Sequence, residues 1–182
     1  MGNIALIKNF LDYLTTEKRY SVHTTVSYQN DLNQFNLYLS ESYSGIEFHK
    51  VEMIHVRSFM VHLLESKLAK STVARKVSCI KSLYKFLKKE QLISSSPVQL
   101  LDTPKVDSRL PVFLKEEEVV NLFEEFNFED SFSGKRDKMI LYLFYQTGIR
   151  LSELIGLKNV DVRNGELKVL GKRNKERIRR FY

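Results

Sequence analysis

Residues 93–114, ISSSPVQLLDTPKVDSRLPVFL, constrain the fold of this chain more than any other stretch, because they contain all three of its prolines. Proline lacks a backbone N–H and moves the residue before it away from helical geometry. A chain of 182 residues is long enough for two small domains. We therefore predict a helical domain at residues 1–102, a linker at 103–110 and a second domain at 111–182.

Helical periodicity marks the first domain. Apolar residues recur every three or four positions in segments of about 4–16, 21–39, 51–66 and 71–89, and Ser21 is suited to cap the second of these. Four helices in so short a segment predict a compact helical bundle. The predicted buried positions are Ile4, Ile7, Leu11 and Leu14 in the first helix, Val22, Val26, Leu32, Phe35 and Leu39 in the second, and Val73, Val77, Ile80, Tyr84 and Leu87 in the fourth.

The second domain combines helices with strands. KEEEVVNLFEEF (115–126) predicts a short helix whose acidic first turn suits the helix dipole, and an apolar helix should run from about Ser133 to Gly148. After another short helix, Asn164-Gly165 predicts a hairpin turn between VDVR and ELKVL, and GKRN predicts a turn into a third strand. The predicted fold class is therefore mainly α with a small β-hairpin sheet.

Charge and cysteine content narrow the function classes. The formal net charge of +7 and the pI near 9.4 favour an anionic partner, of which nucleic acid is the most common, although many other proteins are also mildly basic. The one cysteine, Cys79, excludes an intrachain disulfide and a cysteine-cluster metal site. The N-terminal residues match neither a signal peptide nor a membrane span, so we expect a cytoplasmic protein.

Basic residues gather at the starts of the second and fourth helices. A positive helix start with a hydroxyl group beside it is suited to contact a DNA phosphate or to enter the major groove. The alternative is an ordinary solvated helix face, which is common in lysine-rich helices. The candidate DNA-binding residues in this domain are Lys18, Arg19, Ser21, Thr24, Lys70, Ser71, Arg75, Lys76 and Lys81.

Two further segments, TGIRLSELIGL (147–157) and LGKRNKER (170–177), carry candidates for phosphate chemistry. Arg150 follows a helix end, and its planar guanidinium can hold two phosphate oxygens, while Glu153 would orient that group or cap the next helix. Lys172 falls in a predicted turn, where its ammonium would reach a groove and protonate a departing oxygen. For each of these the alternative is a plain surface charge. The further candidate DNA contacts are Arg173, Lys175 and Arg177.

Taken together, these segments resemble the tyrosine recombinase (phage integrase) family, and its Xer-type site-specific recombinases in particular. The matching stretches are FLDYLTTEKRYSVHTTVSYQNDLNQF, KSTVARKVSCIKSLYKFLKKEQLISSSPVQLL, YQTGIRLSELIGLKNVDV and GELKVLGKRNKER. They occur in the family's order and spacing and cover nearly the whole chain. The resemblance implies a four-helix SAM-like core-binding domain, followed by the N-terminal part of a recombinase catalytic domain.

The resemblance also implies a reaction and its partners. Family members cleave and rejoin DNA strands through a 3′-phosphotyrosyl intermediate, without a metal ion or other cofactor. Their partners are double-stranded DNA with inverted half-sites and further recombinase protomers, which form a tetramer on the DNA. By motif position Arg150 matches the first catalytic arginine, Lys172 the lysine that protonates the 5′-oxygen, and Glu153 a residue that supports the arginine.

The sequence also departs from the family pattern. Family members continue after the hairpin with a His-x-x-Arg motif and a late tyrosine nucleophile, whereas no histidine follows His62 here and Tyr182 comes too soon after the third strand. We therefore expect a C-terminally truncated recombinase that binds DNA and does not cleave it alone. Two alternatives stay open: a stand-alone, non-catalytic DNA-binding protein on the same scaffold, and a helical protein-interaction module. The sequence does not distinguish chromosome dimer resolution, integration and inversion.

Overall fold

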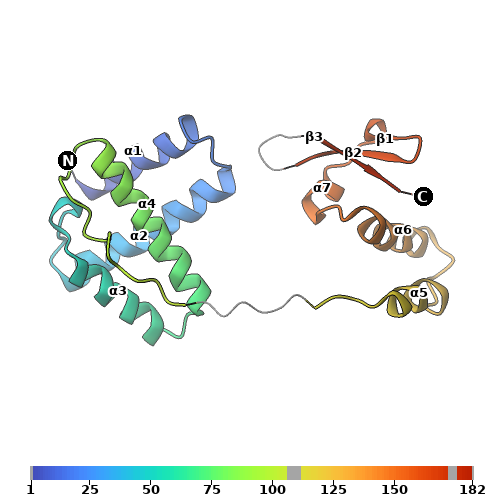
Figure 1. The fold of residues 1–182 in the computed structure, drawn as a ribbon, viewed down its shortest axis with the longest axis horizontal. Coiled ribbons are helices and arrows are strands. Elements are labelled where there is room, and N and C mark those ends of the chain that lie inside the picture. Colours follow the sequence, from blue (N-terminus) through green and yellow to red (C-terminus); the bar gives the residue numbers. More distant parts are fainter. Residues whose placement is uncertain (1, 106–111, 172–175, 182) are drawn as a thin grey trace. The chain divides into compact units, whose positions relative to one another are not determined.

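The computed structural model describes residues 2–105, 112–171 and 176–181 of the chain. The chain divides into two compact units between residues 109 and 110, within the proline-containing segment (Figure 1). Each unit has its own apolar cluster, as separate folding units do. Within the described ranges, no helix is both long enough and apolar enough to cross a membrane.

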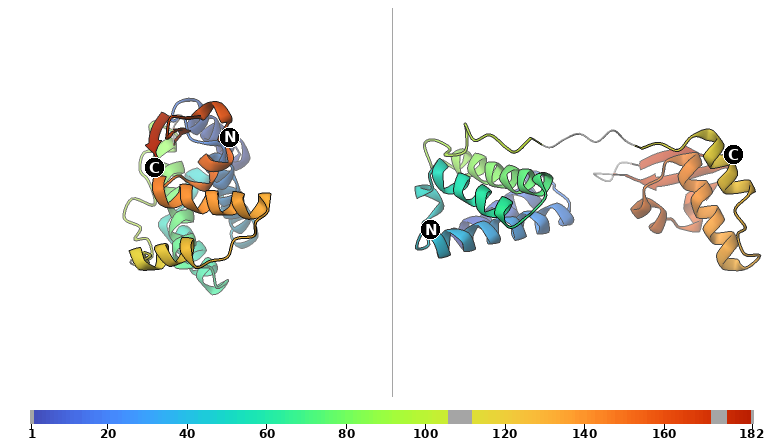
Figure 2. Two further views of the ribbon diagram at one scale, coloured as in Figure 1. Left: turned by 90° about the vertical axis from the view of Figure 1, so that its right-hand side faces the viewer. Right: turned by 90° about the horizontal axis from the view of Figure 1, so that it is seen from below.

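Unit 1, the residues before this division, is built from helices. Its elements are α1 (Asn3–Thr16), α2 (Val22–Ser42), the 3₁₀ helix η1 (Phe48–Lys50), α3 (Met53–Glu65) and α4 (Lys70–Lys89). The helices predicted from periodicity are confirmed, and Ser21 caps α2 by accepting a hydrogen bond from the Thr24 backbone N–H. Helices α2 and α4 each pack against the other three helices, so together they form the centre of the unit (Figure 2).

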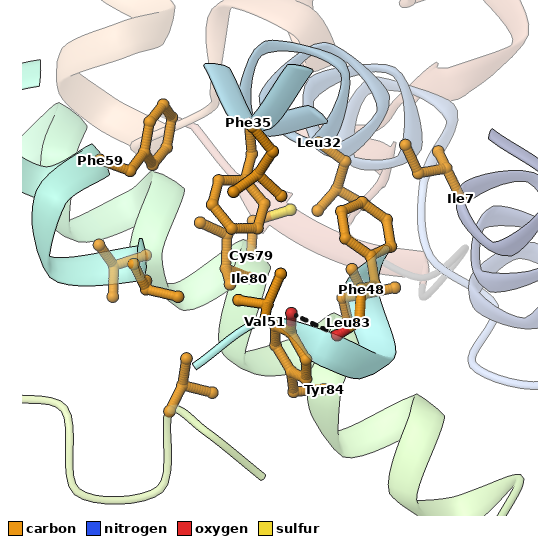
Figure 3. Close-up of a cluster of buried hydrophobic side chains, with 14 of the residues drawn as sticks. Ile7, Leu32, Phe35, Phe48, Val51, Phe59, Cys79, Ile80, Leu83 and Tyr84 are labelled. Carbon is orange, nitrogen blue, oxygen red and sulfur yellow. Dashed lines mark hydrogen bonds between the residues drawn. The ribbon is translucent and has the colours of Figure 1, made fainter. Parts of the chain in front are cut away.

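Aromatic side chains fill the centre of unit 1. The Phe35 ring on α2 lies against Phe48 and Phe59, with ring centroids 6.0 and 5.0 Å apart (Figure 3). Tyr84 on α4 is fully buried, and its hydroxyl donates a hydrogen bond to the Phe48 carbonyl oxygen at 3.0 Å. This bond satisfies the polar end of the ring, so that the whole side chain can leave water. The predicted apolar stripe of α4 is buried throughout, at Val73, Val77, Ile80, Tyr84 and Leu87.

Three predicted core positions are wrong: Ile4, Val22 and Val26 are exposed. An α-helix turns about 100° per residue, so Val26 lies about 180° around α2 from the buried Phe35, and Ile4 lies about 120° around α1 from the buried Phe10. The prediction relied on residue type and approximate spacing. It failed at these positions because the neighbouring helices cover only one face of each helix.

The chain continues to pack on unit 1 after α4 ends. Val98 and Leu101 are buried in the same core. The Lys81 ammonium on α4 donates a hydrogen bond to the Leu101 carbonyl oxygen at 2.6 Å. The packed part of unit 1 therefore reaches Leu101, and Lys81, a candidate DNA contact, has a structural partner.

Unit 2, the residues after the division, combines short helices with an antiparallel sheet, which in the described residues has the strand order β1-β2-β3. Asn164 and Gly165 have φ angles of 49° and 73°, the positive values that a tight two-residue hairpin turn requires. The predicted hairpin and third strand are confirmed. The elements are α5 (Glu116–Glu124), α6 (Phe132–Thr147), α7 (Leu151–Ile155), the 3₁₀ helix η2 (Asn159–Asp161), β1 (Val162–Arg163), β2 (Glu166–Leu170) and β3 (Glu176–Arg180).

The apolar core of unit 2 is small. Its cluster of buried side chains, among the described residues, consists of Ile149, Leu167 and Val169, with partly buried neighbours from α6, α7 and the sheet edge. Because buried apolar area is the main source of stability, unit 2 gains less from burial than unit 1 does. Large apolar side chains of unit 2 that stay exposed include Met139, Tyr145, Leu151, Ile155, Leu170 and Ile178.

Replacing Phe35 with alanine should destabilise unit 1, because it removes a fully buried ring and leaves a cavity. The expected loss in the free energy of unfolding is about 3–5 kcal/mol, measured by urea denaturation followed by circular dichroism. The exposed Ile4→Ala is the control and should change that free energy by less than about 0.5 kcal/mol. Equal losses in the two variants would contradict the assignment of this core.

Candidate functional site

The backbone at Arg150 is held between the end of α6 and the start of α7. Gly148 ends α6 with a φ of 58°, a left-handed conformation that glycine adopts without strain, and its N–H donates to the Phe144 carbonyl oxygen at 3.0 Å. The next residue, Ile149, is buried, and Arg150 takes the N-cap position of α7. The base of the Arg150 side chain is therefore fixed by the surrounding fold.

Glu153 holds both the backbone and the side chain of Arg150. Its side chain is only 4% exposed. One carboxylate oxygen accepts a hydrogen bond from the Arg150 backbone N–H at 2.9 Å, which caps α7. The other oxygen accepts from Nη1 of Arg150 at 2.9 Å and from Nη2 of Arg177, on β3, at 2.5 Å. A buried carboxylate thus joins the helix start to the third strand of the sheet.

The pKa of the Glu153 carboxyl lies below its ordinary value. The hydrogen bond from the Arg150 backbone N–H is the largest cause, and the bond from the Arg150 side chain and the charge of Arg177 act in the same direction, while burial opposes them. The carboxyl is therefore ionised at neutral pH. With two guanidinium groups around one carboxylate, the cluster carries a net charge of +1.

The two arginines differ in how far they can reach a ligand. The Arg150 side chain is 59% exposed, and Glu153 is its one hydrogen-bond partner among the described residues. The planar group is anchored on one side and open to solvent on the other, a geometry suited to holding phosphate oxygens. Arg177 is less exposed, and in the described part of the chain its buried Nε has no hydrogen-bond partner. The sequence proposed Arg177 as a DNA contact; the structure brings it to Glu153.

The remaining candidate residues of unit 2 belong to the connection between β2 and β3. Lys172, Arg173 and Lys175 lie outside the described residues. The flanking strands are defined, since β2 pairs with β3 in antiparallel register and Leu170 lies opposite Glu176.

The candidate residues of unit 1 fall into two groups. Lys18, Arg19 and Ser21 are exposed at the connection from α1 to α2, where the Ser21 hydroxyl lies 2.9 Å from the Thr24 hydroxyl. Lys70 and Ser71 are exposed in the first turn of α4. These side chains are accessible to a ligand. The second group, Arg75, Lys76 and Lys81, makes hydrogen bonds within the protein.

Asp31 on α2, which the sequence analysis did not single out, is the partner of two of these residues. It accepts hydrogen bonds from both terminal nitrogens of Arg75 and from the Lys76 ammonium. The signal that would have identified it is its position: Asp31 lies beside Leu32 and one turn before Phe35, on the buried face of α2. A charged residue on such a face needs a partner from a neighbouring helix.

Replacing Glu153 with glutamine should destabilise unit 2 at neutral pH, because the cluster would lose the charge that holds Arg150 and Arg177 together. Since the folded-state pKa of Glu153 is lowered, its contribution is present above the unfolded-state pKa and is lost as the pH falls through the folded-state value. The difference in melting temperature between variant and wild type should therefore shrink in acid. Thermal denaturation from about pH 7 to about pH 3 measures it.

The matched control for this prediction is Glu118→Gln. Glu118 caps α5 in the same way, accepting from the Lys115 backbone N–H at 2.8 Å, and it is exposed. An equal loss in the two variants would show that helix capping, and not the arginine cluster, accounts for the effect.

Comparison with known sequences gives the family. The profile of the phage integrase N-terminal SAM-like domain matches residues 7–91, and that of the phage integrase family matches residues 112–181. The tyrosine recombinase XerC of Natranaerobius thermophilus is 44% identical over 93% of this chain and 57% of its own length. XerC of Listeria innocua is 38% identical over 94% of this chain and 58% of its own length. The chain thus spans less than two thirds of the relatives it matches.

Solved structures show the same fold. A lambda integrase dimer bound to a COC′ core site matches 98% of this chain, and this chain covers 59% of that one, with a TM-score of 0.73 and 14% identity. The Tn1549 transposon integrase in complex with circular intermediate DNA gives a TM-score of 0.65 at 13% identity, over 95% of this chain and 58% of that one. At such identities the similarity concerns the fold alone, and it confirms the predicted SAM-like domain with part of a catalytic domain. Because the family profiles cover both units and the XerC relatives align along nearly all of the sequence, this chain belongs to the phage integrase, or tyrosine recombinase, family.

Proposed function

We propose that this chain binds double-stranded DNA and contributes part of the phosphate-binding site of a site-specific recombinase. The observation that carries the proposal is the Arg150 guanidinium, which Glu153 anchors from a buried position and which is nevertheless exposed to solvent. A fixed, planar cation that needs no rearrangement is what stabilises negative charge on a phosphate during strand transfer.

The chemistry of the proposed reaction assigns a role to each residue. A tyrosine hydroxyl loses its proton to solvent as its oxygen attacks the scissile phosphorus, a 3′-phosphotyrosyl bond forms, and the bond to the 5′-oxygen breaks. Arg150 binds the nonbridging oxygens, whose charge grows as the new bond forms. Lys172 donates the proton that the departing 5′-oxygen needs. Glu153 keeps Arg150 in place and does not itself contact the DNA.

The partners that we propose follow from charge and from the relatives. The chain has a net charge of +7, and exposed basic and hydroxyl side chains lie just before α2 and in the first turn of α4. The lambda integrase is known as a dimer on a core site and as a tetramer on a Holliday junction. By analogy the partners here are a recombination site with inverted half-sites and further recombinase protomers, in the cytoplasm. The proposed DNA contacts are Lys18, Arg19, Ser21, Thr24, Lys70, Ser71, Arg75, Lys76, Lys81, Arg173, Lys175 and Arg177.

A second candidate function is DNA binding without cleavage. The 182 residues of this chain contain no His-x-x-Arg motif, and their last histidine is His62. The 182-residue polypeptide by itself therefore lacks part of the phosphate-binding groups that the family chemistry uses, and we propose that it holds DNA without breaking it.

Binding of the chain to a DNA duplex should weaken steeply with added salt, because each phosphate contact releases a bound counterion. Six or more contacts predict a loss in affinity of roughly a thousandfold between about 50 and 200 mM salt, measured by fluorescence anisotropy. The Lys70→Met variant should lower the slope of log affinity against log salt by about 0.9. Lys50→Met, which removes an exposed lysine outside the proposed contacts, is the control. Binding that is absent or indifferent to salt would favour a protein-interaction module.

The 182-residue polypeptide should form no covalent adduct with a nicked suicide substrate. The assay is denaturing electrophoresis of the protein with labelled DNA. An adduct that survives denaturation and disappears when one tyrosine is replaced by phenylalanine would overturn the proposal of binding without cleavage.

A further inference from the structure

The buried carboxylate of Asp31 lies between α2 and α4 and connects them. The Asp31 side chain is 2% exposed. Its Oδ1 accepts a hydrogen bond from Nη2 of Arg75 at 3.1 Å and from Nζ of Lys76 at 2.8 Å, and its Oδ2 accepts from Nη1 of Arg75. A charge so far from water is tolerated only where charged partners satisfy it. Since the cluster has two cations and one anion, its net charge is +1.

The hydrogen bonds leave one edge of the Arg75 guanidinium open. This group has five N–H bonds arranged in a plane. Asp31 occupies the end of the fork, and Nη1 also donates to the Ser27 hydroxyl at 2.9 Å. The other edge, formed by Nε–H and the second N–H of Nη2, makes no hydrogen bond to the described residues. The Arg75 side chain is 45% exposed, so the pairing with Asp31 does not withdraw it from solvent.

An arginine held in this way is prepared to bind an anion. Long basic side chains lose rotamer freedom when they bind, and that loss opposes binding. In Arg75 three hydrogen bonds to α2 have already fixed the guanidinium, and the free edge can still donate hydrogen bonds to two oxygens of one phosphate.

We propose that Asp31 and Ser27 are positioning residues that hold Arg75 as a phosphate-binding fork on the DNA-binding surface of unit 1. The inference rests on the proposed function, because the phosphate belongs to bound duplex DNA. Lys76, whose side chain is 11% exposed, also helps to balance the charge of Asp31.

The proposal makes a prediction opposite in sign to that of simple electrostatics. Asp31 is an acidic residue, so neutralising it raises the net charge of the chain by one and, through the overall field alone, should strengthen DNA binding. If Asp31 positions Arg75, the same change should weaken binding, since the fork loses its fixed orientation.

The test compares Asp31→Asn with Glu41→Gln in duplex binding at fixed salt. Glu41 is an exposed residue of α2, and its neutralisation changes the net charge by the same amount. Asp31→Asn should bind about tenfold more weakly than wild type, and Glu41→Gln equally or more tightly. Arg75→Lys, which keeps the charge and loses the fork, should also bind about tenfold more weakly. Circular dichroism before each titration shows that the variants are folded.

A milder variant covers the case in which Asp31→Asn does not fold. Ser27→Ala removes one exposed hydrogen bond to Arg75 and leaves the buried carboxylate paired. Ser27→Ala should weaken DNA binding about threefold. The double variant Ser27→Ala/Arg75→Lys should bind no more weakly than Arg75→Lys alone, because both changes act through the Arg75 guanidinium.

The outcomes separate this inference from the proposed function. Salt-dependent DNA binding by wild type, with Asp31→Asn and Ser27→Ala as tight as Glu41→Gln, would overturn the role of Asp31 and Ser27 and leave the proposed function standing. No DNA binding by wild type would overturn both. Additive losses in the double variant would show that Ser27 acts on something other than Arg75.

Discussion

Glu153 carries its negative charge almost completely out of water, and the geometry of unit 2 around the candidate site depends on how that charge is satisfied. One side-chain carboxylate caps α7 and binds two arginines that are far apart in the sequence, Arg150 and Arg177. Removing either arginine would take a charged hydrogen bond from a buried carboxylate, which is more costly than losing a surface ion pair. The interaction therefore fixes the N-terminus of α7 relative to β3.

Unit 1 repeats this arrangement with different elements. Asp31 is buried on α2 and binds Arg75 and Lys76 of α4, again two cations to one carboxylate. In both places the excess positive charge remains at the surface on an arginine whose guanidinium is partly fixed and partly exposed. Such groups combine two properties that a phosphate site needs, which are a defined direction and access from solvent.

The two units differ in what holds them together. Unit 1 has a continuous core of aromatic and aliphatic side chains, centred on Phe35, Tyr84 and their neighbours. The apolar cluster of unit 2 is built around Ile149, Leu167 and Val169, and many of its apolar side chains are exposed. The position of Arg150 therefore depends strongly on local devices: the glycine that ends α6, the cap of α7 and the ion pairs of Glu153. The glycine and the cap act over a few residues, and the pair between Glu153 and Arg177 links α7 to β3, so these devices need little core to support them.

The sequence by itself determined the elements of the fold and the candidates for the site. Helical spacing located α1 to α4, Asn164-Gly165 located the hairpin because a tight turn needs positive φ, and collinear motifs identified the family and nominated Arg150 and Glu153. These features are local, since capping, turn geometry and amphipathic spacing each depend on residues within a few positions of one another.

Only the tertiary structure decided which charges meet and which faces are covered. Asp31 and Arg75, or Glu153 and Arg177, are separated by 44 and 24 positions. No periodicity links them, and they come together because packed helices and strands bring them there. Val22 and Val26 have the same apolar side chain as the buried Val73, yet they stay exposed because none of the other described helices of unit 1 covers their face of α2. Burial and ion pairing depend on the packing of distant segments, and a one-dimensional pattern does not contain that information.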